Sequence, residues 1–241
     1  PAVVAYDPAF AFELGHIVKD GLRRMYGENS ENIYYYLTVY NEPYVHPAEP
    51  ENLDVEGLLK GIYLYSPASK KRKKNAQILA SGVGVNWALK AQQLLADDWG
   101  VKASVWSVTS WNELRRDGLE ADRHNLLNPK DKHTAYVTKK LKGARGPVIA
   151  VSDYMRAVQD QISPWVEQPF YSLGTDGFGL SDTRGALRRH FNVDAESIAI
   201  AVLQQLCNQG DIKQSIVTKA MNKYRIHDVS AADAGNTEGS G

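Results

Sequence analysis

Four polar side chains gather directly after a predicted strand. Asn41, Glu42, Tyr44 and His46 follow the β-branched and aromatic run ENIYYYLTVY, in a segment rich in proline. Active sites of α/β folds form at the ends of parallel strands, so these side chains are candidates for a functional site. Histidine titrates near neutral pH and can donate a proton or a hydrogen bond. A solvent-facing loop histidine explains the same pattern, and the residues alone leave both interpretations open.

A second stretch, residues 171–184, reads YSLGTDGFGLSDTR and combines three glycines with Asp176 and Asp182. Such residues can cradle a phosphate or hold a divalent cation. A turn between a strand and a helix uses them equally well, with Phe178 anchoring the loop and Ser181 capping the helix that follows. We favour the turn, in which both aspartates accept hydrogen bonds from backbone amides.

Two further stretches suggest ligand binding less specifically. Residues 81–87, SGVGVNW, lie between a predicted strand and a predicted helix, as a dinucleotide-binding loop would. However, Trp87 stands where a third glycine should allow close helix packing, and a tight turn explains the other glycines. The basic run KKRKK at residues 70–74 lacks interleaved aromatic residues, which favours a solvated linker over a nucleic-acid patch.

Complete catalytic motifs are absent from the sequence. It contains no Walker loop and no Gly-x-Ser-x-Gly elbow. The single cysteine, Cys207, excludes an internal disulfide. Four histidines show no ligand spacing relative to one another, so no metal site is predicted: His124, His133, His190 and His227.

Alternating strands and helices must position these side chains. Apolar and β-branched runs predict strands at residues 1–6, 31–43, 76–81, 103–110, 147–152 and 170–174. A short helix and a strand are expected within residues 55–65. Apolar residues at helical spacing predict longer helices between the strands, with N-caps at Asp7, Ser110, Asp153, Asp194 and Asp211. This alternation implies an α/β fold with a mainly parallel sheet covered by helices on both faces.

The pattern divides into two pieces. Residues 1–68 form the first and residues 75–229 form the second, joined by a basic linker at residues 69–74. The polar residues 230–241 are predicted to be a disordered tail.

The overall composition excludes several classes of protein. Lys plus Arg and Asp plus Glu are both 28 among 241 residues, and this neutrality argues against nucleic acid or an anionic membrane as a general partner. No apolar run reaches the ~18 residues that a membrane span needs, and no signal peptide precedes the first strand, so a cytoplasmic protein is expected. The first residue is Pro1 rather than methionine, which predicts a processed chain or a fragment of a longer one.

Four runs of the sequence together resemble one known family. They are ENIYYYLTVYNEPY, KGIYLYS, VWSVTSWNELRRDG and LGTDGFGLSDTRGALRRHFNVDAESI. The family is the homodimeric bacterial pyruvate dehydrogenase first component, a thiamine-dependent decarboxylase, and the actinobacterial type looks most similar. The resemblance covers residues 1–228 and corresponds to the last quarter of a family chain.

The resemblance implies a role for each piece. Residues 1–68 look like the end of the domain that binds the aminopyrimidine of the cofactor, and residues 75–229 look like a transketolase-type C-terminal domain with a mixed, mainly parallel sheet. Thiamine diphosphate and Mg²⁺ would lie at a dimer interface of the parent enzyme. The Gly-Asp-Gly signature of that site is absent here, so this chain alone is not expected to bind the cofactor fully.

The resemblance also implies site residues. After Asn-Glu-x-Tyr, several family members carry a histidine that approaches the cofactor-bound substrate. Here His46 lies one place later, and a one-residue shift in an extended segment redirects a side chain. Glu42 and His46 are thus the candidate catalytic residues, and Asn41 and Tyr44 are the candidate cofactor contacts.

Two functional hypotheses follow. In the first, the parent enzyme decarboxylates pyruvate, the product of glycolysis, and reductively acetylates the lipoyl group of its acyltransferase partner on the way to acetyl-CoA, while this chain alone is inactive. In the second, the chain is a non-catalytic dimerisation or protein-interaction module.

Overall fold

The computed structural model of the protein describes residues 2–68 and 74–232. The predicted linker lies outside these residues except for Lys74, as does most of the predicted tail. Within the described ranges, no helix combines the length and apolar character that crossing a membrane requires.

A five-stranded sheet forms the centre of the larger part of the molecule. Its strands are β3 (Tyr63–Ser66), β4 (Lys74–Ala80), β5 (Val101–Ser107), β6 (Val148–Val151) and β7 (Phe170–Leu173). They lie in the order β3-β5-β4-β6-β7. Strands β4 to β7 pair in parallel, whereas β3 runs antiparallel to β5. The mainly parallel, mixed sheet predicted from the sequence is confirmed.

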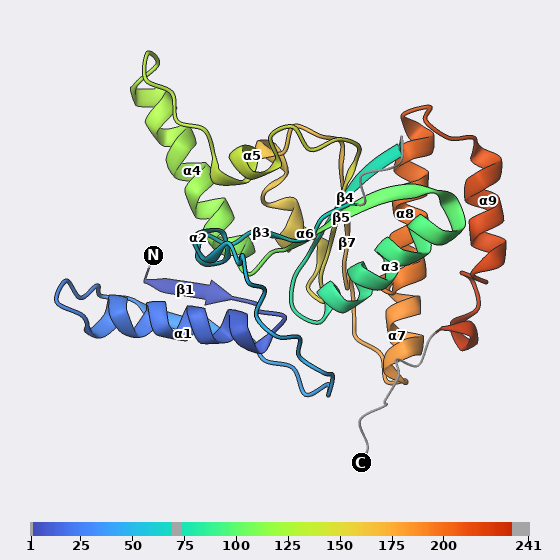
Figure 1. Cartoon of the computed structure of the whole chain (residues 1–241), viewed down its shortest axis with the longest axis horizontal. Coiled ribbons are helices and arrows are strands. Elements are labelled where there is room, and N and C mark those ends of the chain that lie inside the picture. The colour runs from blue at the N-terminus through green and yellow to red at the C-terminus, as the bar shows by residue number, and fades with distance from the viewer. Residues whose placement is uncertain (1, 69–73, 233–241) are drawn as a thin grey trace.

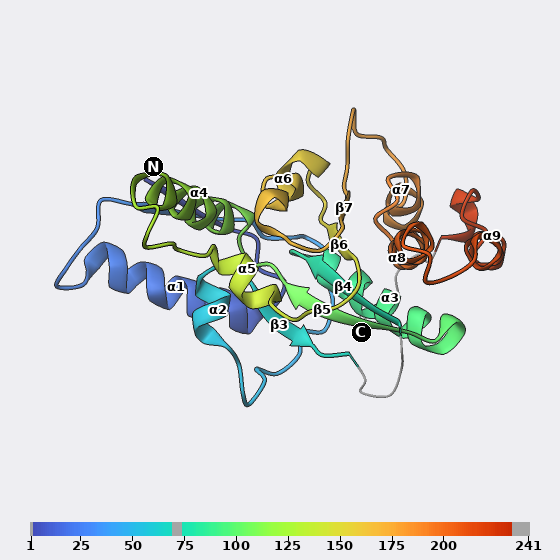
Figure 2. The same ribbon diagram turned by 90° about the horizontal axis from the view of Figure 1, so that it is seen from above.

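Helices cover both faces of this sheet (Figure 2). On one face lie α3 (Gly84–Trp99) and α8 (Ala195–Asn208), with α9 (Gln214–Lys223) packed on α8. On the other lie α4 (Trp111–Leu127), α5 (Tyr136–Leu141) and α6 (Arg156–Asp160). Successive residues of a strand point to opposite faces, so Ile78 packs in the first cluster and Leu79 in the second. The sequence predicts α3 and α8 well but misses α5.

A smaller layer lies beside the β3 edge (Figure 1). Strands β1 (Val3–Tyr6) and β2 (Tyr34–Leu37) pair in parallel, and helices α1 (Ala11–Tyr26) and α2 (Val55–Leu59) complete the layer. Its own core contains Val4, Tyr6, Ile17, Leu58 and Tyr63. Tyr63 belongs to β3, so the two layers share a strand. The sequence places residues 63–66 in the first piece, but hydrogen bonding to β5 places them in the larger sheet.

Three predicted N-caps differ from the structure. Helix α1 begins at Ala11 rather than after Asp7, because the Asp7 carboxylate is drawn to hydroxyl groups elsewhere in the fold. Helix α9 begins at Gln214, and Asp211 does not cap it. Helix α6 begins at Arg156 rather than after Asp153, and it ends after five residues before the short 3₁₀ helix η1 (Ser163–Trp165).

Two other predicted caps are confirmed. The Ser110 hydroxyl accepts a hydrogen bond from the Glu113 amide at the start of α4, and the Asp194 carboxylate accepts one from the Ser197 amide at the start of α8. Near the end of the described residues, Val229–Ala231 form the 3₁₀ helix η2, so the described beginning of the predicted tail is ordered.

Candidate functional site

Two buried carboxylates join the smaller layer to the carboxyl edge of the large sheet. Asp7 accepts hydrogen bonds from the hydroxyls of Thr38 (2.5 Å), Tyr40 (2.7 Å) and Ser81 (2.6 Å), the last of which directly follows β4. Burial raises the pKa of the Asp7 carboxyl above its ordinary value, and these hydrogen bonds oppose the rise. Asp7 therefore fixes the chain just before the candidate loop.

Glu13 makes the second connection from helix α1. Its carboxylate accepts from the hydroxyls of Tyr63 (2.7 Å) and Ser107 (2.6 Å), and from the amides of Ala9 (2.5 Å) and Phe10 (3.1 Å). Glu13 is fully buried, and burial raises its pKa while the hydrogen bonds lower it. The sequence signal for this residue is its place between Phe10 and Ile17 on the apolar face of the helix.

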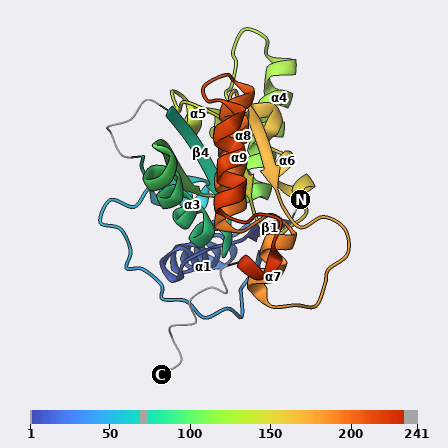
Figure 3. The ribbon, with the colours of Figure 1, turned by 90° about the vertical axis from the view of Figure 1, so that its right-hand side faces the viewer.

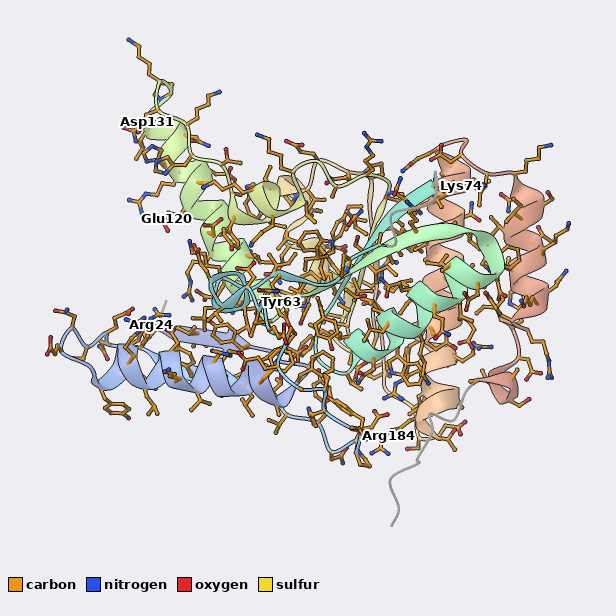
Figure 4. The ribbon with its side chains drawn as sticks, viewed as in Figure 1. Arg24, Tyr63, Lys74, Glu120, Asp131 and Arg184 are labelled. Atoms are coloured by element: carbon orange, nitrogen blue, oxygen red, sulfur yellow. The ribbon has the colours of Figure 1, made fainter. Side chains whose placement is uncertain are left out.

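The 41–46 loop is held at its first end by α7 (Arg184–His190). The Asn41 side-chain oxygen accepts from the Arg184 guanidinium at 3.2 Å. Glu42 forms an ion pair with Arg188 in which both carboxylate oxygens are engaged, one of them at 3.1 Å. Figure 4 labels Arg184 at the margin of the molecule, on the same side as this loop.

The other end of the loop is held by the start of α1. The Tyr44 hydroxyl donates to the carbonyl of Ala9, and Nδ1 of His46 accepts from the Ala11 amide at 3.1 Å. The Tyr44 and His46 rings lie 4.6 Å apart. Because Nδ1 acts as an acceptor, the neutral His46 ring carries its proton on Nε2. The residue is exposed.

The two stretches that the sequence singles out meet at one cavity of about 330 Å³. Asn41 and Glu42 line it from one side, Gly179 and Leu180 from another, and Arg188 from α7. Tyr44 and His46 do not line this cavity, so the four candidate residues divide into two pairs with different surroundings.

The chain between β7 and α7 is a structural turn that loops out from the body (Figure 3). Asp176 accepts from the Arg156 amide at 3.0 Å and Asp182 from the Thr183 amide at 2.7 Å, so the prediction that both bind backbone amides is confirmed. A side chain at Gly174 would meet the carbonyl of Tyr154 at 2.4 Å, which explains that glycine.

Two details of this turn differ from expectation. Phe178 is 96% exposed and does not anchor the loop. Thr183 rather than Ser181 caps α7, since its hydroxyl accepts from the Ala186 amide at 3.3 Å. The cap differs because the chain reaches the helix two residues later than the sequence pattern indicates.

Two histidines that look unrelated in the sequence lie together in the structure. The rings of His124 and His133 stack 3.5 Å apart at the end of α4, and Asp131 joins them. Among the described residues, no comparable group of three metal-ligating side chains forms at the 41–46 loop. The loop residues are committed to Arg184, Arg188 and the start of α1, so by themselves they build neither a Mg²⁺ site nor a diphosphate cradle.

Comparison with known proteins gives consistent matches. Residues 61–194 match the family model of the transketolase-like C-terminal domain, and residues 1–47 match the middle domain of the pyruvate dehydrogenase E1 component. The first match begins at residue 61, just before β3, in agreement with the sheet pairing.

Curated relatives are similar over nearly the whole chain. The pyruvate dehydrogenase E1 component of Mycolicibacterium smegmatis is 61% identical over 96% of this chain, and that of Mycobacterium tuberculosis is 58% identical over 99%. The Escherichia coli protein of the same name is 42% identical over 94%. This chain spans only about a quarter of the length of these relatives.

Solved structures show the same fold at low identity. A transketolase from Pichia stipitis superposes with a TM-score of 0.58 at 19% identity, over 88% of this chain and 26% of that one. Transketolase from Leishmania mexicana gives 0.57 at 16% identity, over 86% and 26%.

Proposed function

The chain belongs to the transketolase-like C-terminal domain family, in the form found in bacterial pyruvate dehydrogenase E1 components, and from this premise we propose that its parent enzyme decarboxylates pyruvate. In the parent, the acetyl group then passes reductively to the lipoyl group of an acyltransferase. The observation that carries the proposal is the 61% identity to an E1 component over 96% of the chain, including the candidate loop.

We propose that this chain contributes only one part of the active site. Thiamine diphosphate supplies the electron sink for decarboxylation in the parent, and Mg²⁺ neutralises its diphosphate. The 41–46 loop does not fit that group by itself, because its polar side chains are already paired. We propose that other parts of the parent hold the cofactor and that this loop forms one edge of the substrate site.

Each loop residue then has a distinct task. His46 offers Nε2–H as a hydrogen-bond donor to the substrate, since its Nδ1 is occupied by the Ala11 amide. Glu42, paired with Arg188, sets the path of the loop. Asn41 and Tyr44 hold the two ends in place and bring the loop backbone toward the cofactor.

The remaining features of the parent are proposed on the same basis. It acts in the cytoplasm as a homodimer within the pyruvate dehydrogenase complex, with the acyltransferase as its partner. The exposed aromatic rings of Tyr34 and Tyr36 on β2 favour a covering surface in the assembled enzyme. The same rings would serve an interaction module without catalytic function, which is the alternative role.

A comparison of two polypeptides tests the proposal. Release of CO₂ from pyruvate is measured with added thiamine diphosphate and Mg²⁺, once for this 241-residue chain and once for the longer polypeptide that contains it. We expect activity from the longer polypeptide only. An inactive longer polypeptide overturns the assigned reaction, and an active 241-residue chain overturns the supporting role.

The alternative role has its own measurement. The immobilised chain is offered the acyltransferase, with and without thiamine diphosphate. Capture that does not depend on the cofactor, together with an inactive longer polypeptide, supports the interaction module.

A further inference from the structure

A cluster of potential metal ligands lies at the far end of helix α4. His124 belongs to the last turn of the helix, and Asp131 and His133 belong to the segment that leads on to α5. One ligand atom from each of the three side chains lies within 4.8 Å of the others. Figure 4 shows Asp131 at the tip of α4, where the helix projects away from the sheet. The cluster is therefore remote from the 41–46 loop and accessible to solvent.

The distances in the cluster are close to those of a coordinated ion. Nε2 of His124 lies 3.6 Å from a carboxylate oxygen of Asp131, and the two imidazole rings stack 3.5 Å apart at 5°. Two ligands bonded tetrahedrally to Zn²⁺ at about 2.1 Å are about 3.4 Å apart. Nε2 of His124 also binds the backbone carbonyl of Asp131 at 2.8 Å. Because the lone pairs of an imidazole lie in the plane of the ring, one ion can bind both rings only after they rotate out of their parallel stack and Nε2 leaves this carbonyl.

Backbone and side-chain hydrogen bonds hold the cluster in shape. The Asn125 side chain binds His133 at two points, donating to its carbonyl at 2.8 Å and accepting from its amide at 2.7 Å. Asn128 donates to the His124 carbonyl at 3.0 Å, and the Asp131 amide donates to the Asn128 carbonyl at 3.0 Å. The segment is folded back onto the helix end before any ion binds, which lowers the entropy lost on binding.

The electrostatic setting also favours a cation. His124 lies in the last turn of α4, where the carbonyl ends of the peptide dipoles concentrate negative potential. Lys130 and Lys132 flank Asp131 in sequence, but both are exposed, so water and salt screen their charges. Two imidazoles with one carboxylate form a ligand set that suits Zn²⁺ better than Ca²⁺ or Mg²⁺, which prefer all-oxygen sites.

We propose that His124, Asp131 and His133 form a binding site for a divalent transition-metal ion, with Zn²⁺ as the best fit and water as the fourth ligand. The ion fastens the segment between α4 and α5 to the end of α4. This site is independent of the proposed reaction, because it lies apart from the loop that would contact substrate.

Metal titration tests the proposal directly. The chain is freed of metal with a chelator and titrated with ZnCl₂ by calorimetry. We expect one equivalent to bind, and His124→Gln, Asp131→Asn and His133→Ala each to weaken binding by at least about tenfold. Exposed His227 is the matched control, and His227→Ala should bind like the wild type.

Two further readouts separate ligation from folding. Co²⁺ replaces silent Zn²⁺ and should give visible absorption bands in the wild type that His133→Ala lacks. Zn²⁺ should raise the Tm of the wild type but not of that variant, whereas circular dichroism without metal should be the same for both. Absence of binding, or equal binding by the wild type and the three ligand variants, overturns the proposal.

Discussion

Glu42 and Arg188, 146 residues apart in the chain, form a two-point ion pair that joins the 41–46 loop to helix α7. The Arg188 guanidinium also lies over the Trp87 ring at 4.6 Å. Arg188 is only 8% exposed, so the pair is largely shielded from water. Its geometry ties the candidate loop to the two helices α3 and α7 rather than leaving it a free surface segment.

Arg188→Ala should therefore destabilise the protein more than Arg184→Ala, a substitution on the same helix. The change leaves the Glu42 carboxylate partly buried without its partner, and we expect the free energy of unfolding to fall by about 2 kcal/mol. Arg184→Ala removes an exposed contact to Asn41 and should change it by about 0.5 kcal/mol or less. Urea unfolding followed by circular dichroism measures both; equal losses would contradict the role of the ion pair.

The buried carboxylate of Glu13 should make stability depend on pH. Because burial raises its pKa in the folded chain above the value of 4.5, the folded state holds the proton more tightly than the unfolded state. The contribution of this group to stability is thus fully present below that value and is lost as the pH rises through the folded pKa.

Glu13→Gln should remove this dependence. Between pH 4.5 and pH 7, the wild type should lose more free energy of unfolding than the variant, by at most about 1.4 kcal/mol per pH unit. Exposed Glu120 supplies the control, and Glu120→Gln should keep the wild-type slope. Parallel curves for wild type and Glu13→Gln would show that burial does not shift this carboxyl.

Gly82→Ala should disturb the junction next to Asp7. Gly82 has a φ of +52°, and an added Cβ would meet the Tyr40 hydroxyl at 2.2 Å. The methyl group both strains the backbone and pushes Tyr40 away from Asp7, so we expect a loss of at least about 2 kcal/mol in unfolding free energy. Gly84→Ala meets only ordinary contacts and should be neutral or slightly stabilising. Thermal melts of the two variants compare these effects.

The start of α7 gives a test of the corrected cap. Thr183→Ala should lower stability by about 1 kcal/mol, because it removes the acceptor for the Ala186 amide. Ser181→Ala should stay within about 0.5 kcal/mol of the wild type. If urea unfolding showed a larger loss for Ser181→Ala than for Thr183→Ala, the helix would be capped by Ser181, as the sequence pattern predicts.

These cases show which parts of the fold are determined by the local sequence. The alternation of strands and helices, and the caps at Ser110 and Asp194, were predictable because each depends on residues within one turn. Asp7 was misjudged because Asp-Pro before an apolar helix has the pattern of an N-cap. Its actual partners are hydroxyl groups distant in the sequence, of which Ser81 lies 74 residues away. Only the folded chain brings the two together.

The candidate site was predictable to the same extent. The sequence located the 41–46 loop at a strand end and identified the 171–184 turn as structural. It could not show that Arg188 pairs with Glu42, nor that His124 meets His133, since both contacts depend on how distant segments pack. Spacing rules detect ligands that share one helix turn. They do not detect His133, which the segment after α4 places beside His124.

The two ring nitrogens of His46 have different roles, which substitutions can separate. Nδ1 accepts from the Ala11 amide and so supports the start of α1, whereas Nε2–H is the group that we assign to the substrate. In His46→Asn the side-chain oxygen can replace Nδ1 as the acceptor, but the amide N–H groups of the shorter side chain do not reach the position of Nε2–H. In the full-length parent enzyme, His46→Ala and His46→Asn should both lower kcat by about 100-fold, the usual range for loss of one hydrogen-bond donor to developing charge. Only His46→Ala should also lower the Tm. Recovery of kcat by His46→Asn would instead show that the histidine acts only by holding the loop against α1.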